Sequence, residues 1–279
     1  MIPLAVHCMQ GRLLPPVDRR IQAFPGERWP EEFPLAKQAG VEGIEVIYES
    51  HADDENPLSS NAGTKRLRGL SARDAIAVQS VCADWFMERP LLAREQPARD
   101  LEWLAQRAAA AGITRVVLPL VDRSSLGGAR AADALASLLD VLAPVLLELG
   151  VELHLETDLE PERFARLLER LEYPSVGANY DTGNSASLGY DPREEFEAFG
   201  RRIASVHVKD RLRGGDTVPL GEGDADLELV LGLLRGLDWQ RPVVLQTARG
   251  RSGEEVARVR ADAQLVRSLW DRAASLSWT

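Results

Sequence analysis

Cysteine and basic residues are both scarce in this sequence of 279 residues. The two cysteines, Cys8 and Cys82, lie far apart and form no C-x-x-C pair, which argues against a disulfide scaffold and against a thiolate metal site. The 33 lysine and arginine residues are outnumbered by 43 aspartate and glutamate residues, giving a net charge of −10. Because nucleic-acid binding depends on basic side chains that neutralise phosphates, we expect no nucleic-acid partner.

Long apolar segments are absent as well. The longest apolar runs, such as residues 141–149, are interrupted by Pro144 and Glu148 and fall well short of the roughly 20 residues of a membrane span. The opening segment, MIPLAVHCMQGR, has no basic stretch ahead of its apolar residues and no small-residue cleavage site after them. We therefore expect a cytoplasmic protein with no membrane partner.

Short apolar runs alternate with longer amphipathic segments from one end of the chain to the other, which is typical of α/β proteins. The runs predict eight strands, at Leu4–Met9, Gly43–Tyr48, Ile76–Cys82, Arg115–Pro119, Val151–Glu156, Ser175–Asp181, Ala204–Lys209 and Pro242–Thr247. The segments between them predict eight helices, at Trp29–Gln38, Ala62–Ala72, Ala98–Ala111, Ala129–Leu149, Pro161–Leu171, Pro192–Arg202, Leu227–Arg235 and Glu254–Ala274.

The regular alternation bears on how the strands are arranged. Eight strands, each followed by a helix, with no polar linker or break in composition, favour a closed (β/α)8 TIM barrel that forms a single domain over residues 1–279. An open doubly wound sheet is the alternative. No G-x-G-x-x-G motif follows the first strand, which argues against that alternative.

Polar side chains end four consecutive predicted strands. In GVELHLET the apolar leucines face the helices, so the alternation of a strand turns Glu152, His154 and Glu156 inward. The same reasoning applied to the next three strands gives an inward set at the carboxyl ends, Glu156, Asp181, His207 and Gln246. Two carboxylates, an imidazole and an amide oxygen suit one divalent ion such as Mn²⁺, Mg²⁺, Co²⁺ or Zn²⁺. A hydrogen-bonded structural network explains any one of them, but four in one layer favour a metal site.

The residues around this set carry a family resemblance that spans nearly the whole chain. The stretches YDTGNSASLGYD, SVHVKDR and VPLGEGDADLE resemble L-ribulose-5-phosphate (L-xylulose-5-phosphate) 3-epimerases and ketose 3-epimerases, which are sugar isomerases and epimerases with a xylose-isomerase-like TIM barrel. MQGRLLPP and FPGERWPEEFPLAKQAGVEGIEVIYE are similar to a subgroup of sugar phosphate isomerase/epimerase-like proteins. The resemblance implies a divalent metal on Glu156, Asp181 and His207, with Gln246 in the fourth place.

Gln246 departs from the pattern of that family. The 3-epimerases place a glutamate there that both binds metal and moves a proton, whereas the amide of Gln246 can coordinate but cannot accept a proton near neutral pH. The resemblance implies an isomerase or epimerase that acts on a sugar or sugar phosphate through a metal-stabilised enediolate. Glu156 is the expected base. Lys209, two residues after His207 and on the same inward face, is the candidate donor for the opposite face, with an ion pair as its alternative role.

Further side chains near the strand ends are candidates for substrate binding, each with a structural role as the alternative. A hydrogen bond, an ion pair, a turn or core packing is the structural alternative, and for Glu45 an ion pair with a neighbouring arginine is the commoner role. They are His7, Glu45, Trp85, His154, Asn184 and Arg249.

Two other functions from different classes remain open at this point. Enolate chemistry can also expel a β-hydroxyl, so an inosose-dehydratase-like lyase acting on a cyclic polyol is one alternative. A non-catalytic binding or partner subunit is the other, because of the glutamine at position 246. A multi-metal DNA-repair endonuclease of the endonuclease IV type is disfavoured by four histidines and the net charge of −10. Helices rich in alanine and leucine could support a homo-oligomer.

Overall fold

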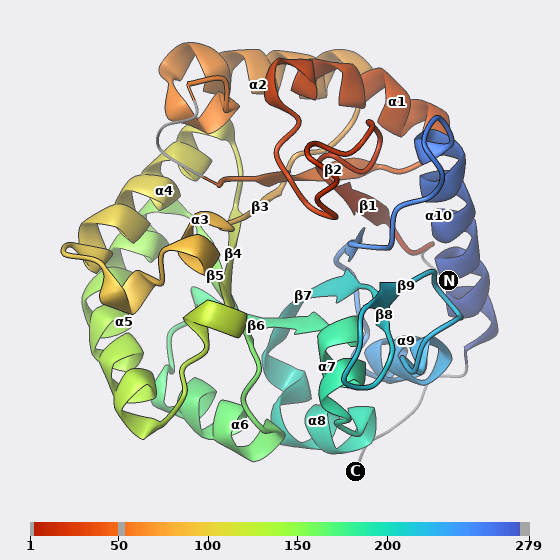
Figure 1. Ribbon diagram of the computed structural model, residues 1–279. Helices are drawn as coiled ribbons and strands as arrows, with labels where there is room; N and C mark the ends of the chain where they lie inside the picture. The colour runs from red at the N-terminus through yellow and green to blue at the C-terminus, as the bar shows by residue number, and fades with distance from the viewer. Residues whose placement is uncertain (1–2, 50–53, 274–279) are drawn as a thin grey trace.

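Eight parallel strands close into a barrel in the computed structural model, which describes residues 3–49 and 54–273. The strands follow the order β1-β10-β7-β6-β5-β4-β3-β2 around the barrel (Figure 1). They are β1 (Val6–Met9), β2 (Gly43–Ile47), β3 (Ser80–Cys82), β4 (Arg115–Leu120), β5 (Glu152–Thr157), β6 (Val176–Asp181), β7 (Ile203–Val208) and β10 (Val243–Leu245). Each predicted strand overlaps one of these eight, although the predicted Ile76–Cys82 is shortened to Ser80–Cys82 and the predicted Pro242–Thr247 to Val243–Leu245, and the (β/α)8 TIM barrel is confirmed.

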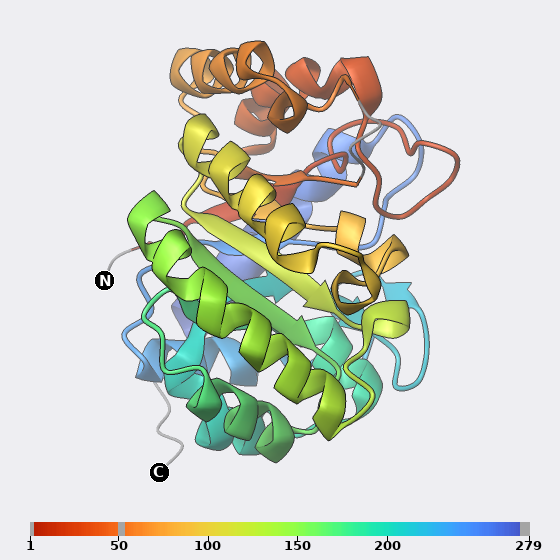
Figure 2. The ribbon, with the colours of Figure 1, turned by 90° about the vertical axis from the view of Figure 1, so that its left-hand side faces the viewer.

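Helices cover the outside of this barrel (Figures 1 and 2). Those that follow the strands are α1 (Glu32–Ala39), α2 (Asn61–Asp74), α4 (Pro97–Ala111), α5 (Ala129–Leu149), α6 (Pro161–Arg170), α8 (Pro192–Phe199), α9 (Leu227–Gly236) and α10 (Glu255–Arg272). Prolines occupy the first turns of α4, α6 and α8, where the missing N–H is harmless. Left-handed Gly40, Gly112 and Gly150 end α1, α4 and α5.

Short elements that the periodicity does not predict lie at the carboxyl ends of the strands. They include α3 (Trp85–Glu88), α7 (Thr182–Leu188) and an antiparallel hairpin of β8 (Asp210–Arg211) and β9 (Thr217–Val218). In Figure 2 the arrowheads of β4 and β5 point toward the end of the barrel where this hairpin and the loop after β1 lie. These segments build the walls above the barrel.

The alternation of each strand separates two cores. Outward side chains such as Val46, Leu155 and Val206 pack under the helices, whereas Met9, Ile47, Cys82, Val117 and Val244 form a small apolar cluster inside the barrel. No helix in the described part of the chain is long and apolar enough to cross a membrane. The predicted single domain over residues 1–279 and the predicted end of the last helix, Ala274, include positions outside the described residues.

Candidate active site

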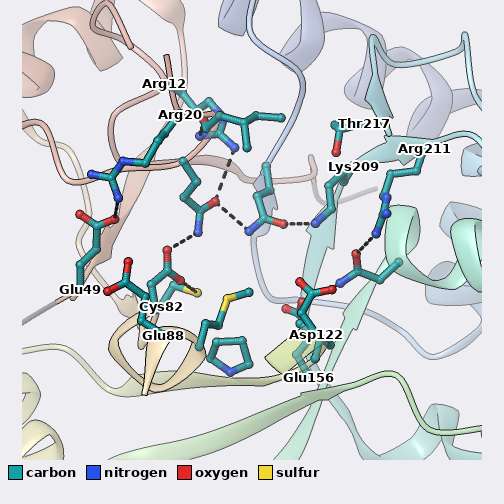
Figure 3. Close-up of a pocket in the computed structure, with 18 residues that line it drawn as sticks. Arg12, Arg20, Glu49, Cys82, Glu88, Asp122, Glu156, Lys209, Arg211 and Thr217 are labelled. Carbon is teal, nitrogen blue, oxygen red and sulfur yellow. Dashed lines mark hydrogen bonds and ion pairs between the residues drawn. The ribbon is translucent and has the colours of Figure 1, made fainter. Parts of the chain in front are cut away.

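A cavity of about 380 Å³ opens at the carboxyl ends of the strands (Figure 3). Four of the sequence-predicted site residues line it, namely Glu156, Asn184, Lys209 and Gln246. The other side chains of the wall come from strand ends, short helices, the β8–β9 hairpin and loops: Arg12, Arg20, Ile21, Gln22, Glu49, Cys82, Asp84, Met87, Glu88, Pro119, Val121, Asp122, Arg211 and Thr217. The wall therefore combines strand ends with loops from distant parts of the sequence.

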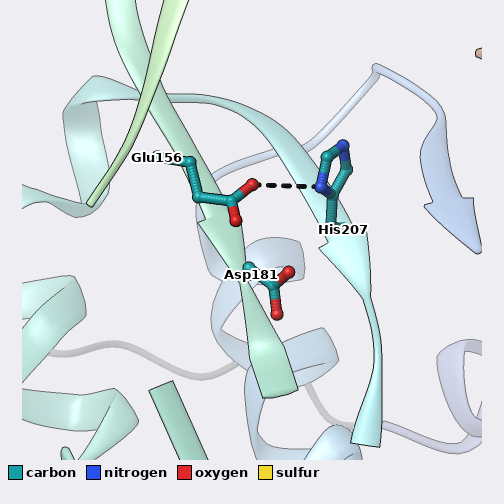
Figure 4. Close-up of side chains that lie close together, drawn as sticks. All are labelled: Glu156, Asp181 and His207. Atoms are coloured by element: carbon teal, nitrogen blue, oxygen red, sulfur yellow. Dashed lines mark ion pairs between the residues drawn. The ribbon is translucent and has the colours of Figure 1, made fainter. Parts of the chain in front are cut away.

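Three predicted metal ligands converge beside this cavity (Figure 4). One ligand atom from each of Glu156, Asp181 and His207 lies within 4.8 Å of the others. Glu156 belongs to β5, and Asp181 pairs directly with His207 in the register of β6 and β7. All three side chains are buried, with 4%, 5% and 0% of their surface exposed. Because these side chains point into the barrel from adjacent parallel strands, two carboxylates and an imidazole lie in one layer.

Asparagines hold the two carboxylates in place. Oε2 of Glu156 accepts a hydrogen bond from Nδ2 of Asn179 at 2.7 Å, and Oε1 accepts one from Nδ2 of Asn184 at 2.8 Å. Oδ1 of Asp181 accepts the backbone N–H of Asn184 at 2.8 Å and so caps the N-terminus of α7. These bonds use part of the acceptor capacity of each carboxylate, which leaves further lone pairs for a cation.

His207 lies between two carboxylates. Its Nε2 is 2.8 Å from Oε1 of Glu45, and its Nδ1 is 3.2 Å from Oε2 of Glu156. Although burial lowers the pKa of His207, these two carboxylates raise it to about 10, so the imidazole is protonated in the metal-free protein. Burial alone raises the pKa of Glu156, but His207 and Lys209 bring it below its usual value. The carboxylates therefore stabilise positive charge where the ligand atoms meet.

The donor set fits a divalent ion. Oδ2 of Asp181 and Nδ1 of His207 are buried and make no well-directed hydrogen bond within the described residues, and each lies within ion-pair distance of a charged neighbour. Nζ of Lys209 lies 2.8 Å from Oδ2 of Asp181 and 2.7 Å from Oε1 of Gln246. The ammonium thus bridges two of the predicted ligands. Mixed oxygen and nitrogen donors with spare lone pairs suit Mn²⁺, Mg²⁺, Co²⁺ or Zn²⁺.

Three predicted substrate-binding residues lie inside the barrel and do not line the cavity. The ring nitrogens of His154 contact Ser205 at 2.9 Å and Glu152 at 2.8 Å. His7 is buried, and burial together with Arg115 lowers its pKa to about 4. Glu45 is fully buried against His207, as the outer carboxylate partners of metal-binding histidines commonly are. The predicted substrate contacts of His7, Glu45 and His154 stay predictions.

Two more predicted residues stand behind the cavity wall. Trp85 is the first residue of α3, packs against Phe86 with ring centroids 4.9 Å apart, and lies 3.9 Å beneath the guanidinium of Arg94. Arg249 donates to the backbone carbonyls of Leu14 and Ile21 in the loop after β1. Neither side chain lines the cavity. Arg249 holds in place a loop that does.

Sequence reasoning missed Arg12, Gln22 and Asp84 in the wall. Arg12 and Gln22 belong to the irregular segment between β1 and the 3₁₀ helix at Gly26–Glu31, where periodicity carries no information. Asp84 follows β3 by two residues, and this position at a strand end was the one available signal. Burial raises the pKa of Asp84 to about 6.

Comparisons with known proteins agree with this fold. The family described as "Xylose isomerase-like TIM barrel" matches residues 33–269, whereas a search of curated proteins finds no match. A xylose isomerase domain protein from Planctomyces limnophilus superposes with a TM-score of 0.72 at 18% identity, covering 98% of this chain and 99% of its own. D-psicose 3-epimerase from Clostridium cellulolyticum H10 gives 0.73 at 11% identity, covering 98% and 100%. The IolI protein with a bound zinc atom gives 0.70 at 16%, also covering 98% and 100%.

Proposed function

This chain belongs to the family of xylose isomerase-like TIM barrels, and we propose that it is a divalent-metal-dependent isomerase or epimerase acting on a sugar or sugar phosphate. The observation that carries the proposal is the convergence of Glu156, Asp181 and His207 within 4.8 Å beside the cavity. A cavity of about 380 Å³ has the size of a small-molecule site. The activity named for D-psicose 3-epimerase, which has the same fold, supports the choice of a sugar.

Glu156, Asp181, His207 and the amide oxygen of Gln246 would hold the ion. When bound, a divalent ion polarises the carbonyl of a substrate and so acidifies the neighbouring C–H bond. Glu45 fixes the orientation of the His207 ring from behind through the 2.8 Å contact to Nε2, which leaves Nδ1 for the ion. Asn184 does the same for Glu156 and Asp181, because its side chain and its backbone N–H bind one carboxylate each.

Glu156 is the group that would take the proton. Its carboxylate lines the cavity, and its pKa lies below the usual value because His207 and Lys209 outweigh the effect of burial, so it is ionised at neutral pH. Hydrogen bonds from Asn179 and Asn184 fix its position. A carboxylate fixed in this way can move a proton between adjacent carbons on one face of a sugar, which is a 1,2 isomerisation.

Epimerisation needs a second group on the opposite face of the sugar. Gln246 cannot transfer a proton, but it accepts a hydrogen bond from Nζ of Lys209 at 2.7 Å. Lys209 lines the same cavity with 13% of its side chain exposed. Its ammonium is therefore the proton donor that we assign to the second face, with Gln246 and Asp181 holding it in position.

Hydrogen exchange in D₂O tests the proposal. Protein loaded with Mg²⁺ or Zn²⁺ is mixed with ketoses, ketose phosphates and inososes, and proton NMR follows the carbon next to the carbonyl. We expect exchange with at least one compound, and Glu156→Gln to slow it by about a thousandfold, within the range for a lost general base. Asp122→Asn, which alters another carboxylate of the same wall, is the matched control.

The products separate the candidate reactions. A ketose that becomes an aldose indicates isomerisation, an inverted carbon indicates epimerisation, and loss of a β-hydroxyl indicates the inosose-dehydratase-like lyase. If protein that is shown to hold metal exchanges no proton in any of these compounds, the isomerase or epimerase proposal is wrong. A non-catalytic binding role would then replace it.

A further inference from the structure

Four polar side chains form an unbroken series of hydrogen bonds across the cavity wall, starting from Lys209 in Figure 3. Nζ of Lys209 donates to Oε1 of Gln246 at 2.7 Å. Nε2 of Gln246 donates to Oε1 of Gln22 at 2.9 Å, and Nε2 of Gln22 donates to Oδ2 of Asp84 at 2.7 Å. This relay of Lys209, Gln246, Gln22 and Asp84 connects the ends of β7 and β10 with the loop after β1 and the end of β3.

The two ends of the relay fix its direction. The ammonium of Lys209 can only donate hydrogen bonds, and an ionised carboxylate can only accept them. Burial raises the pKa of Asp84 to about 6, which still leaves it ionised at neutral pH. Sγ of Cys82 also donates to Oδ1 of Asp84 at 3.0 Å, so both oxygens of this carboxylate accept. Each glutamine amide between the two ends offers one donor group and one acceptor atom. Gln22 must therefore turn Nε2 toward Asp84, and Gln246 must turn Nε2 toward Gln22. Nη2 of Arg12, which donates to Oε1 of Gln22 at 3.5 Å, favours the same orientation of Gln22.

We propose that Asp84 is a positioning residue which, through Gln22, turns the amide oxygen of Gln246 toward the ligand set. The amide makes its hydrogen bonds among the described residues to Lys209 and Gln22, so the relay determines which of its two ends faces Lys209, the residue that also contacts Asp181. An amide reversed at this point would present N–H groups to an ammonium or to a metal ion, and both are repelled by N–H donors. The inference rests on the proposed function, because only a metal site gives the amide oxygen of Gln246 a role as a ligand. The hydrogen bonds of the relay themselves do not depend on a metal.

The relay also explains why glutamine and not glutamate suits position 246 in this chain. A carboxylate there would place an acceptor against Oε1 of Gln22. Gln22 would have to rotate its amide, which would then turn Oε1 toward the carboxylate of Asp84. Asparagine at position 84 removes that conflict, because its amino group can donate to Gln22 while its oxygen still accepts from Cys82. The substitutions Asp84→Asn and Gln246→Glu are thus compatible with the relay when made together. Gln246→Glu alone places two acceptors against each other, and Asp84→Asn alone removes the charged end that fixes the direction of the relay, because the new amide can adopt either orientation.

Binding of Co²⁺ measures the effect of Asp84 on the ligand set. Isothermal titration and the visible absorption of bound Co²⁺ are recorded for the wild type, Asp84→Asn and Asp122→Asn. Asp122 is a second aspartate of the same wall that lies outside the relay, so Asp122→Asn is the matched loss of charge. We expect Asp84→Asn to weaken binding about tenfold and to change the Co²⁺ spectrum, as substitutions behind metal ligands do. Equal weakening by the two variants would overturn the inference, because charge alone would then explain it.

A thermal double-mutant cycle in the presence of a chelator tests the relay without any metal. We expect Asp84→Asn and Gln246→Glu each to lower Tm, and the double variant to melt above both single variants, although positions 84 and 246 do not touch. Additive losses would overturn the inference. If Asp84→Asn does not fold, a folded double variant supports the relay, and an unfolded one contradicts it. Failure of the wild type to bind Co²⁺ would refute the proposed metal site but leave this cycle to decide the relay.

Discussion

The inside of the barrel holds two polar layers that differ in how well their groups are satisfied. In the lower layer, of Glu152, His154, Ser205 and Arg241, both nitrogens of His154 are hydrogen-bonded and Glu152 is paired with Arg241 at 2.5 Å. In the upper layer, of Glu156, Asp181 and His207, buried atoms of Asp181 and His207 lack a well-directed hydrogen bond. The four groups of the lower layer are thus paired with one another, whereas the upper layer keeps buried ligand atoms without a well-directed hydrogen bond.

The two histidines show the difference most directly. Both have 0% of their surface exposed. Burial lowers the pKa of His154 despite the nearby Glu152, with Arg241 and Arg115 acting in the same direction as burial. Burial also opposes the charge of His207, but Glu45 and Glu156 outweigh it and raise the pKa to about 10. The balance of surrounding charges, and not depth, therefore decides which of the two histidines has a raised pKa.

Replacing each histidine with asparagine should give the largest measurable difference between the two layers. His207→Asn removes a proposed ligand and should weaken Zn²⁺ binding by more than about 100-fold, which is the upper range for residues that only support a ligand. His154→Asn should leave Zn²⁺ affinity nearly unchanged but lower the free energy of unfolding by about 1–3 kcal/mol through its lost buried hydrogen bonds. Titration calorimetry and urea unfolding measure the two effects. Equal losses of Zn²⁺ affinity would show that the layers are not functionally distinct.

The upper layer could be predicted from the sequence because strands impose a two-residue period. In β5 the leucines that must face the helices also determine that Glu156 faces inward, and the same parity applies to Asp181 and His207. Parity does not determine depth along the barrel axis, however. The side chains of His7 and His154 also point into the barrel, but they are buried in its interior and do not line the cavity.

The loops could not be predicted in the same way. Gln22 and Asp84 follow no periodicity, and their contact joins segments 62 residues apart. Trp85 follows β3 closely enough to suggest a wall of the cavity, but α3 turns its ring into an aromatic cluster beneath Arg94. The sequence therefore predicts the side chains that strands carry, whereas the positions of Gln22, Asp84 and Trp85 could be found only from the structure.

Proton release on metal binding sharpens the contrast between the two histidines. His207 must lose its proton to become a ligand, and its pKa is about 10 in the metal-free protein. Below that pH the apparent affinity for Zn²⁺ should rise about tenfold for each pH unit, with about one proton released for each ion bound. Calorimetry in buffers of different ionisation enthalpy counts the protons.

The same raised pKa has the opposite effect on the metal-free fold. A group whose folded pKa lies above its unfolded value stabilises the protein fully below the unfolded pKa, here 6.5, and this stabilisation is lost as the pH rises through about 10. His207→Asn should abolish both dependences, and His154→Asn should preserve them. A metal affinity that does not change between about pH 6 and about pH 9 would contradict the charge assigned to His207.

The smallest expected effect is on the preference between a ketose and its phosphate. This preference depends on the basic side chains of the cavity wall, which lies beside the upper layer. Each basic group of the cavity wall already has partners. Arg12 donates to two backbone carbonyls, Arg20 pairs with Glu49, Arg211 binds Gly215 and Asn184, and Lys209 binds Asp181 and Gln246. Five carboxylates line the same wall, those of Glu49, Asp84, Glu88, Asp122 and Glu156.

Such a wall suits a neutral polyol better than a dianion, because its spare capacity lies in acceptors and not in donors of positive charge. We expect kcat/KM for a ketose phosphate to be roughly two- to fivefold below that for the parent ketose, since partly exposed charges are screened by solvent. Glu88→Gln should reduce the difference in kcat/KM between the two substrates, because it removes one negative charge from the wall. Added salt should reduce this difference as well. A preference of tenfold or more for the phosphorylated sugar would show that one of the four cations exchanges its partner for phosphate, and Arg20→Ala and Arg211→Ala would then show whether it is one of these two.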